Sequence, residues 1–308
     1  MNERTDRELE RAEHQRSIGQ IDGAIDTLKR VLTGDPDNGD AHALLAICLL
    51  GKRRLHAARI EGHMALTLAP ESVLAHWVGA ELAIAARKFD VAGRHVERLL
   101  AESPESAEFH RLKARLLSLT GAEKQRLPVL EQALACDPND PETLAELADF
   151  HRSSGDLAQA ERYAREALGI SAENTSGLIA LGQVMLARGD IEEARELALS
   201  ALQADPENVG GLHLLTAIKA RSNFFLGLWW RYAAWGARVG PTKNIIVLLV
   251  AYFVYRVLII MTSEAGADTA STAISIGWLA IVVYSFLGPT LFNKALKKEL
   301  ETVRLRRF

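Results

Sequence analysis

The chain has 308 residues, enough for two domains of ordinary size, and its net charge of −3 conceals an uneven distribution. Residues 223–308 contain four acidic and ten basic side chains, so this part is near +6 and residues 1–222 are near −9. An acidic body followed by a basic, apolar tail indicates a membrane anchor. The charged N-terminal residues contain no apolar run, so we expect no secretory signal there.

The sequence shows no motif that is typical of catalysis, metal binding or phosphate binding. Its two cysteines, Cys48 and Cys136, form no CxxC motif and lie in no His/Cys cluster of metal-ligand spacing. We expect both to be reduced thiols in a cytosolic setting. The chain contains no phosphate-binding glycine loop, no GxSxG and no HExxH. We therefore expect no metal, no cofactor and no catalytic residue, and predict that the protein is not an enzyme.

Proline recurs on a 34-residue grid. The series comprises Pro36, Pro70, Pro104, Pro138 and Pro206. The one slot without proline is Ala172. A fixed period of this length indicates stacked units, each of which buries its apolar face only against its neighbours.

Small residues follow the same period when each unit is counted from residue 5 onward in steps of 34. The eighth place holds Ala12, Ala46, Ala80, Ala114, Ala148 and Gly182. The twentieth place holds Ala24, Ala58, Ala92, Ala160 and Ala194, with Arg126 in the remaining unit. The fifteenth place holds Gly19, Gly121, Gly155 and Gly189. Two helices that cross closely need small residues at the crossing, and glycine permits the turn between them, so we predict two helices per unit.

This pattern resembles the tetratricopeptide repeat family, whose 34-residue helix-turn-helix units carry small residues at places eight and twenty and proline at thirty-two. The resemblance covers residues 5–38, 39–72, 73–106, 107–140, 141–174 and 175–208, and we add a degenerate seventh unit over 209–240. It implies an all-α fold, a right-handed superhelical solenoid of helix pairs over residues 5–240. Such a fold implies binding of partner proteins.

Two features depart from the family pattern. The tryptophan usual at the fourth place is replaced by Glu8, His42, His76, His110, Leu144 and Leu178. Adjacent units are offset by roughly 10 Å, whereas zinc–nitrogen bonds are about 2 Å, so we interpret the three histidines as packing residues and not as a metal ladder. Pro128 falls early in the second helix of its unit and predicts a late or kinked start there.

The first helices of such repeats line a concave groove, so their exposed positions are the expected binding surface. Our candidates for partner binding are Trp77, Glu81, Arg111, Arg115, Asp149 and Arg152. We hypothesise that Trp77 and the arginines contact an extended or helical segment of a partner. The alternative is that several of these residues only pack against the next unit. Some tetratricopeptide chaperone adaptors hold a peptide carboxylate with a set of Lys and Asn that is absent here, so that activity is not implied.

Aromatic residues gather in the second helix of the seventh unit, over about 225–239. The candidate membrane-interface residues are Trp229, Trp230, Arg231, Tyr232, Trp235 and Arg238. Trp and Tyr favour the headgroup level, and Arg favours anionic lipid. This segment is either a capping helix over the last repeat or a helix in the membrane plane. We favour a capping helix whose outer edge contacts lipid.

Two apolar runs follow, at 244–262 and 272–292, and each is close to the ~20 residues that span a bilayer core. They predict a transmembrane hairpin over 241–292. Arg256 lies within the first run, where an unrelieved arginine costs about 2.5–3.5 kcal/mol. We expect it to reach the outer interface or to pair with Glu264; the alternative is a residue on an ion path.

The orientation follows from the basic residues. Lys and Arg precede the first span and follow the second, whereas the loop over 263–271 between the spans has neither. By the positive-inside rule, both termini are cytoplasmic, and the basic tail over 293–308 can lie on the inner leaflet. Arg outnumbers Lys and Ala is abundant, which favours a bacterial source and therefore the bacterial cytoplasmic (inner) membrane.

These features predict a scaffold that recruits cytoplasmic proteins to the membrane through its repeats. A second hypothesis is an accessory subunit whose hairpin packs into a transporter or membrane enzyme. We expect protein partners, contact with the lipid bilayer and no nucleic acid. A homo-oligomer or a larger membrane complex remains an open alternative.

Overall fold

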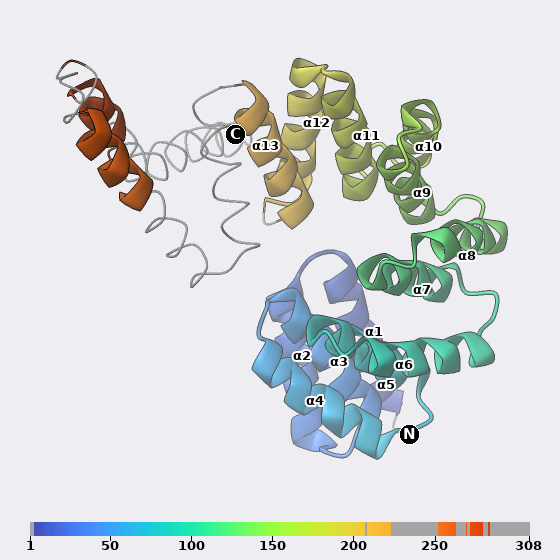
Figure 1. Ribbon diagram of the computed structural model, residues 1–308. Helices are drawn as coiled ribbons and strands as arrows, with labels where there is room; N and C mark the ends of the chain where they lie inside the picture. Colours follow the sequence, from blue (N-terminus) through green and yellow to red (C-terminus); the bar gives the residue numbers. More distant parts are fainter. Residues whose placement is uncertain are drawn as a thin grey trace. The chain divides into compact units, whose positions relative to one another are not determined.

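The computed structural model describes residues 3–206, 208–222, 252–262, 269, 272–279 and 283. Helices joined by short turns make up the chain from 3 to 222, and no strand occurs anywhere in the described part (Figure 1). Each helix contacts the next along the chain in most of this stretch. The prediction of an all-α solenoid of helix pairs is confirmed.

The helices recur with the period of the prolines. The first helix of each pair is α1 (Glu3–Ser17), α3 (Gly39–Gly51), α5 (Val73–Ala85), α7 (Ala107–Thr120), α9 (Pro141–Ser153), α11 (Thr175–Arg188) or α13 (Val209–Ser222). The second helix is α2 (Ile21–Gly34), α4 (Leu55–Leu68), α6 (Phe89–Glu102), α8 (Glu123–Cys136), α10 (Leu157–Ile170) or α12 (Ile191–Ala204). From α3 onward, every first helix begins at the residue that follows the thirty-fourth place.

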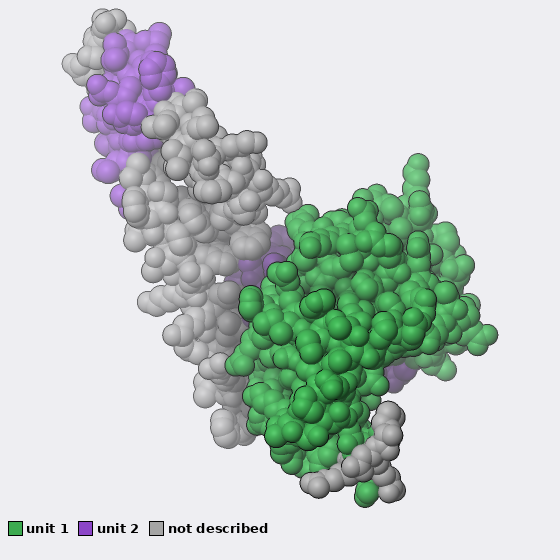
Figure 2. All heavy atoms as spheres, turned by 90° about the horizontal axis from the view of Figure 1, so that it is seen from below, with its two compact units in different colours: residues 1–147 green, residues 148–308 purple. Residues whose placement is uncertain are grey.

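The chain divides into two compact units, Met1–Leu147 and Ala148–Phe308 (Figure 2). In unit 1, the core contains the fully buried side chains of Leu28, Val78, Leu99 and Leu130. In unit 2, the core of α11, α12 and α13 includes Met185, Leu202, Leu215 and Ile218.

The small residues at places eight and twenty permit close packing of the paired helices. The ten alanines at these places, from Ala12 to Ala194, are each at most 1% exposed. At Gly182, an added Cβ would lie 2.5 Å from Leu214 Cδ2, so a larger residue fits only if the Leu214 side chain on α13 shifts. Arg126, which replaces alanine in one unit, is also buried, with 6% of its surface exposed.

The turn within each pair requires a left-handed backbone at the fifteenth place. The glycines there have φ between +76° and +101° where the structure places them next to α7, α9 and α11. Arg53 and Arg87 occupy the same place in two units, and both have φ +56°. Glycine adopts this conformation freely, whereas other residues do so at a cost, so the turn geometry is imposed on these two arginines by the helices on either side.

A capping residue precedes every first helix from α3 onward. These residues, all at the thirty-fourth place, are Asn38, Ser72, Ser106, Asp140, Asn174 and Asn208. Each side-chain oxygen accepts a hydrogen bond from the backbone N–H three residues later, at distances from 2.6 to 3.4 Å. Because the capping residue satisfies an N–H that the helix itself cannot, the period fixes where each helix starts.

The prediction of a late helix start at Pro128 is wrong. Helix α8 begins at Glu123, in register with the other second helices, and contains Pro128 in its interior. The proline lacks the N–H that would otherwise bond to the carbonyl of Lys124. Both residues are exposed, so water can satisfy that carbonyl.

The C-terminal predictions fall largely outside the described residues. This holds for the helix over 225–239, for the tail over 293–308 and for most of both predicted spans. Residues 252–262 and 272–279 are helical, and Tyr255 stacks on Trp278 with ring centroids 4.8 Å apart. No helix among the described residues is long and apolar enough to cross a membrane.

Candidate protein-binding pocket

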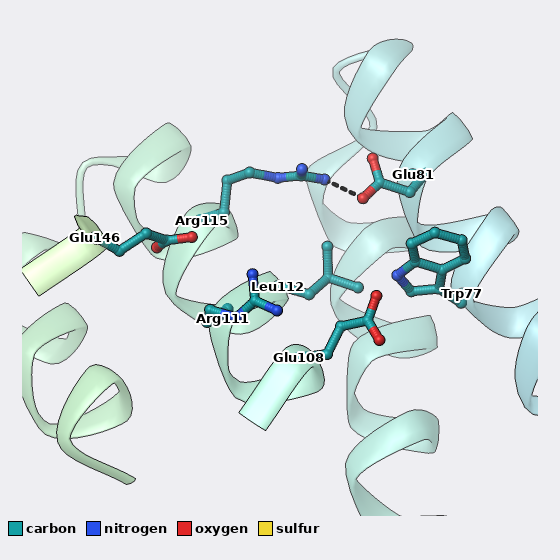
Figure 3. Close-up of a pocket in the computed structure, with 7 residues that line it drawn as sticks. All are labelled: Trp77, Glu81, Glu108, Arg111, Leu112, Arg115 and Glu146. Atoms are coloured by element: carbon teal, nitrogen blue, oxygen red, sulfur yellow. Dashed lines mark hydrogen bonds and ion pairs between the residues drawn. The ribbon is translucent and has the colours of Figure 1, made fainter. Parts of the chain in front are cut away.

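A pocket of about 190 Å³ lies in unit 1, and the first helices of three successive repeats line it (Figure 3). Helix α5 contributes Trp77 and Glu81, α7 contributes four residues, and α9 contributes Glu146. The residues from α7 are Glu108, Arg111, Leu112 and Arg115. They recur at i, i+3, i+4 and i+7, which places them on one face of the helix.

Trp77 connects the pocket to the core of unit 1. Its ring packs against two hydrophobic clusters, one around Ala43 and Val78 and the other around Leu99 and Phe109. The side chain is only partly buried, and its nitrogen-bearing edge points toward the pocket (Figure 3). The indole is therefore held in place by packing while one edge remains available to a ligand.

Both arginines of the pocket have carboxylate partners in the chain itself. Arg115 forms an ion pair with Glu81, which lies 34 residues earlier at the same place of the preceding unit (Figure 3). Arg111 Nε lies 2.9 Å from Oδ2 of Asp140, the residue that also caps α9. These pairs join successive units across the solenoid face, and they neutralise the two cations.

A buried arginine forms an ion pair with one of the pocket-lining residues. Arg126 lies with its guanidinium 3.7 Å from Glu123 and 4.0 Å from Glu146. Because a buried cation needs an opposite charge close by, these two carboxylates explain how arginine is tolerated at a place where the other units have alanine. The contact also holds Glu146 at the rim of the pocket.

The structure brings together four of the six residues proposed from the sequence, namely Trp77, Glu81, Arg111 and Arg115. Asp149 and Arg152 belong to unit 2, where Arg152 Nη2 lies 2.6 Å from Asp149 Oδ1. Glu108, Leu112 and Glu146 were not among the candidates from the sequence. Those candidates stand at places five, nine and twelve of their repeats, whereas Glu108 stands at place two, one helical turn before Arg111, and that spacing could have revealed it.

The histidines of the fourth place fill packing positions. His42 Nε2 lies 2.9 Å from the carbonyl oxygen of Pro36, and His110 Nε2 lies 2.8 Å from that of Pro104. In each case the ring closes onto the proline that ends the preceding unit. No group of three potential metal ligands occurs among the described residues.

A second partner lies 19 residues after two of these histidines. His42 Nδ1 is 2.6 Å from Glu61, whereas His76 Nδ1 is 2.9 Å from Nδ1 of His95, which stands at the place of that glutamate in the next unit. Burial lowers the pKa of His95, and the neighbouring His76 and Arg94 lower it further. Equivalent places in the two repeats therefore differ in charge: one repeat has a histidine–carboxylate pair and the next has a histidine–histidine pair.

The thiols match a reduced protein. Cys48 is buried and Cys136 is exposed, and neither forms a disulfide. Burial raises the pKa of the Cys48 thiol, although Arg16 opposes that effect, so this sulfur is a poor nucleophile.

The residues predicted to meet the membrane, Trp229 to Arg238, lie outside the described part of the chain. Arg256 is in the helical segment 252–262 and is exposed. Its predicted partner Glu264 is outside the described residues.

Comparison with known families decides the classification. Three sequence models, each described as a tetratricopeptide repeat, match residues 18–61 and 151–218, residues 79–141, and residues 129–162. Together they cover more than half of the chain. The chain belongs to the tetratricopeptide repeat family. The resemblance proposed from the 34-residue period is thus confirmed for the repeats, and no curated protein matches the chain.

Solved structures with the same fold support this assignment. A tetratricopeptide repeat protein from Parabacteroides merdae is 17% identical, with a TM-score of 0.59, over 70% of this chain and 84% of its own. PilW, described as a widely conserved type IV pilus biogenesis factor, is 20% identical, with a TM-score of 0.54, over 70% of this chain and 100% of its own. At these identities, the likeness concerns the fold alone.

Proposed function

We propose that this tetratricopeptide repeat protein is a membrane-anchored scaffold that binds a partner protein through the pocket between α5, α7 and α9. The repeats supply the binding surface, and the apolar C-terminal region tethers it to the cytoplasmic membrane of a bacterium with both termini inside the cell. No enzymatic step forms part of this proposal.

The observation that carries the binding role is the composition of the pocket. A rigidly packed tryptophan, a leucine and several charged side chains from successive units converge on one hollow. Anchors of protein interfaces are typically aromatic residues and arginines in a pocket with a polar rim. Proteins of this family act through such contacts between their repeats and a partner.

The anchoring role draws support from the apolar surface near the C-terminus. Phe253, Met261, Ile276 and Leu279 are each more than 60% exposed. Large apolar side chains that are exposed in this way favour an apolar environment such as lipid or a partner protein. The aromatic contact of Tyr255 with Trp278 joins the two segments, as a hairpin would require.

The proposed function is tested by crosslinking in native membranes followed by mass spectrometry. We expect the full chain to capture a defined set of proteins, and the Trp77→Phe/Arg115→Ala variant to lose them. The control is His56→Gln, which changes an exposed residue on α4 away from the pocket. Identical sets of proteins for the wild type and the pocket variant would contradict the role of this pocket.

A second candidate function is that of an accessory subunit of a membrane transporter or enzyme. It draws on the small exposed residues Ala273 and Gly277, one helical turn apart, which allow close helix packing. If the repeats joined to an unrelated membrane anchor restore function, the hairpin is only a tether. If they do not, the hairpin itself has specific partners.

A further inference from the structure

We propose that the pocket between α5, α7 and α9 receives a single basic side chain, lysine or arginine, from the partner segment. This inference rests on the proposed function of the pocket and specifies the chemistry of its ligand. The sequence-based hypothesis named Trp77 and the arginines as contacts of an extended or helical partner segment and left the charge of that segment open.

Both arginines of the pocket are already paired. Arg115 binds Glu81, and Arg111 binds Asp140. Because these internal carboxylates balance the charge of the two guanidinium groups, an acidic ligand would gain less here than at a free arginine. The guanidinium groups thus shape the pocket and hold its helices together instead of attracting an anion.

The charges around the pocket sum to a negative value. The pocket-lining residues and their direct ion-pair partners include four carboxylates and three guanidinium groups. The carboxylates are Glu81, Glu108, Asp140 and Glu146. An excess of negative charge in a partly enclosed hollow favours a cation, because the walls screen the interaction less than bulk water does.

Glu108 lies where it can bind a cation. It is exposed at the first turn of α7, and within the described residues no basic side chain forms an ion pair with it. Trp77 and Leu112 lie beside it and supply an apolar wall (Figure 3). A lysine or arginine can lay its aliphatic stem along that wall while its charged group reaches the Glu108 carboxylate.

The volume of the pocket limits its occupant to one side chain. A pocket of about 190 Å³ accommodates one long side chain and lies below the range of about 300–1,000 Å³ that is usual for sites of larger ligands. The rest of the partner segment would then lie across the exposed faces of α5 and α7.

The test is a selection from a library of capped random dodecapeptides against the full chain, solubilised in detergent and immobilised. Three variants run beside the wild type: Glu108→Lys, Trp77→Phe/Arg115→Ala and Glu131→Lys. The last is the matched control, because Glu131 is exposed on α8 and its replacement changes the net charge equally without touching the pocket. Circular dichroism and the melting temperature verify that each variant is folded.

We expect the wild type and Glu131→Lys to enrich peptides with Lys or Arg at one fixed position. Binding of these peptides should fall about tenfold in Glu108→Lys, with a shift toward Asp or Glu at that position, and should weaken in 0.5 M salt. Enriched peptides that depend on Trp77 and Arg115 but show no basic position would overturn this inference and leave the proposed function intact. If no peptide is enriched, or if the enriched peptides are indifferent to both pocket variants, the inference and the binding role of the pocket both fail.

Discussion

Two arginines show how a single residue can carry strain for the repeat. Arg53 and Arg87 have the left-handed backbone that glycine supplies in the other units. For a residue with a Cβ this conformation costs about 1–2 kcal/mol. The hydrogen bonds on either side stabilise this strained conformation, such as the bond from Arg54 N–H to the carbonyl of Leu49.

The replacement Arg53→Gly should therefore stabilise the protein. Relief of the left-handed strain is offset in part by the greater backbone entropy of glycine in the unfolded chain, about 0.5–1 kcal/mol, which leaves a net gain of about 0.5 kcal/mol. Urea unfolding would show it as a higher midpoint. Arg54→Gly is the control, because φ is −85° there, and it should lower the midpoint; a lower midpoint for Arg53→Gly would refute the account.

The pair of His76 and His95 should make stability depend on pH. The pKa of His95 is lowered in the folded state by burial, by His76 and by Arg94. The unfolded chain therefore binds the proton more readily, and the contribution of this group is present above pH 6.5 and is lost as the pH falls from there toward the folded pKa.

We expect the urea midpoint of the wild type to fall between pH 7.5 and pH 5, and the fall to be smaller in His95→Asn. His56→Gln serves as a control, because His56 is exposed on α4 and its replacement should leave the pH profile unchanged. The same pH dependence in the wild type and in His95→Asn would show that other groups govern the response.

The first and second helices of each repeat start in different ways. Each first helix from α3 onward starts with a side-chain cap at the thirty-fourth place, whereas most second helices start without one, as at Lys88 before α6. The second helix instead follows a tight turn whose left-handed residue fixes its direction. The two helix types of the repeat therefore begin by different means.

Loss of a cap should weaken one helix in particular. Asn174→Ala removes the 2.6 Å bond to Gly177 N–H and should cost about 1 kcal/mol. Amide exchange should accelerate most in the first turn of α11. Lys88→Ala, at a start without a side-chain cap, should change stability little; equal losses in both variants would refute the special role of the thirty-fourth place.

At the scale of the molecule, the two compact units present different surfaces. Unit 1 contains the pocket of mixed charge, whereas unit 2 contains the exposed apolar segments near the C-terminus. The proposed function assigns partner binding to the first and membrane attachment to the second. The change from acidic to basic charge along the sequence lies further on, near residue 222, within unit 2.

The membrane assignment predicts the behaviour of the chain in cell fractionation. The full chain should sediment with membranes and resist extraction by alkaline carbonate, because apolar spans are not removed by a change of charge. A chain ended at Gly240 should be released by the same wash. Release of the full chain by carbonate would contradict a transmembrane hairpin.

A large part of the fold could be predicted from the sequence, because residue size and backbone preference at fixed places determine the geometry of each repeat. The small residues from Ala12 to Ala194, the turn glycines and the spaced prolines indicate two helices per unit without reference to contacts. Pro128 shows the limit: its local preference predicts a late helix, but packing of Val129, Leu130 and Ala133 in the core of unit 1 keeps α8 in register.

The candidate site was predictable only in part. Trp77, Glu81, Arg111 and Arg115 follow from the places that line the first-helix face. Glu108 and Glu146 did not, and neither did the charge of the pocket, because the sequence does not show which carboxylate neutralises which arginine. The pairs Arg115–Glu81 and Arg111–Asp140 join residues 34 and 29 positions apart, so they form only when the repeats are stacked.

The sequence by itself therefore determined the repeat, its helices and the first-helix face that we propose for partner binding, because these depend on residue size, turn chemistry and period within each repeat. Only the tertiary structure decided how the charges of that face pair. Ion pairing depends on distances between repeats, and at these distances Arg111 and Arg115 pair with carboxylates of the chain itself, whereas Glu108 stays exposed beside Trp77.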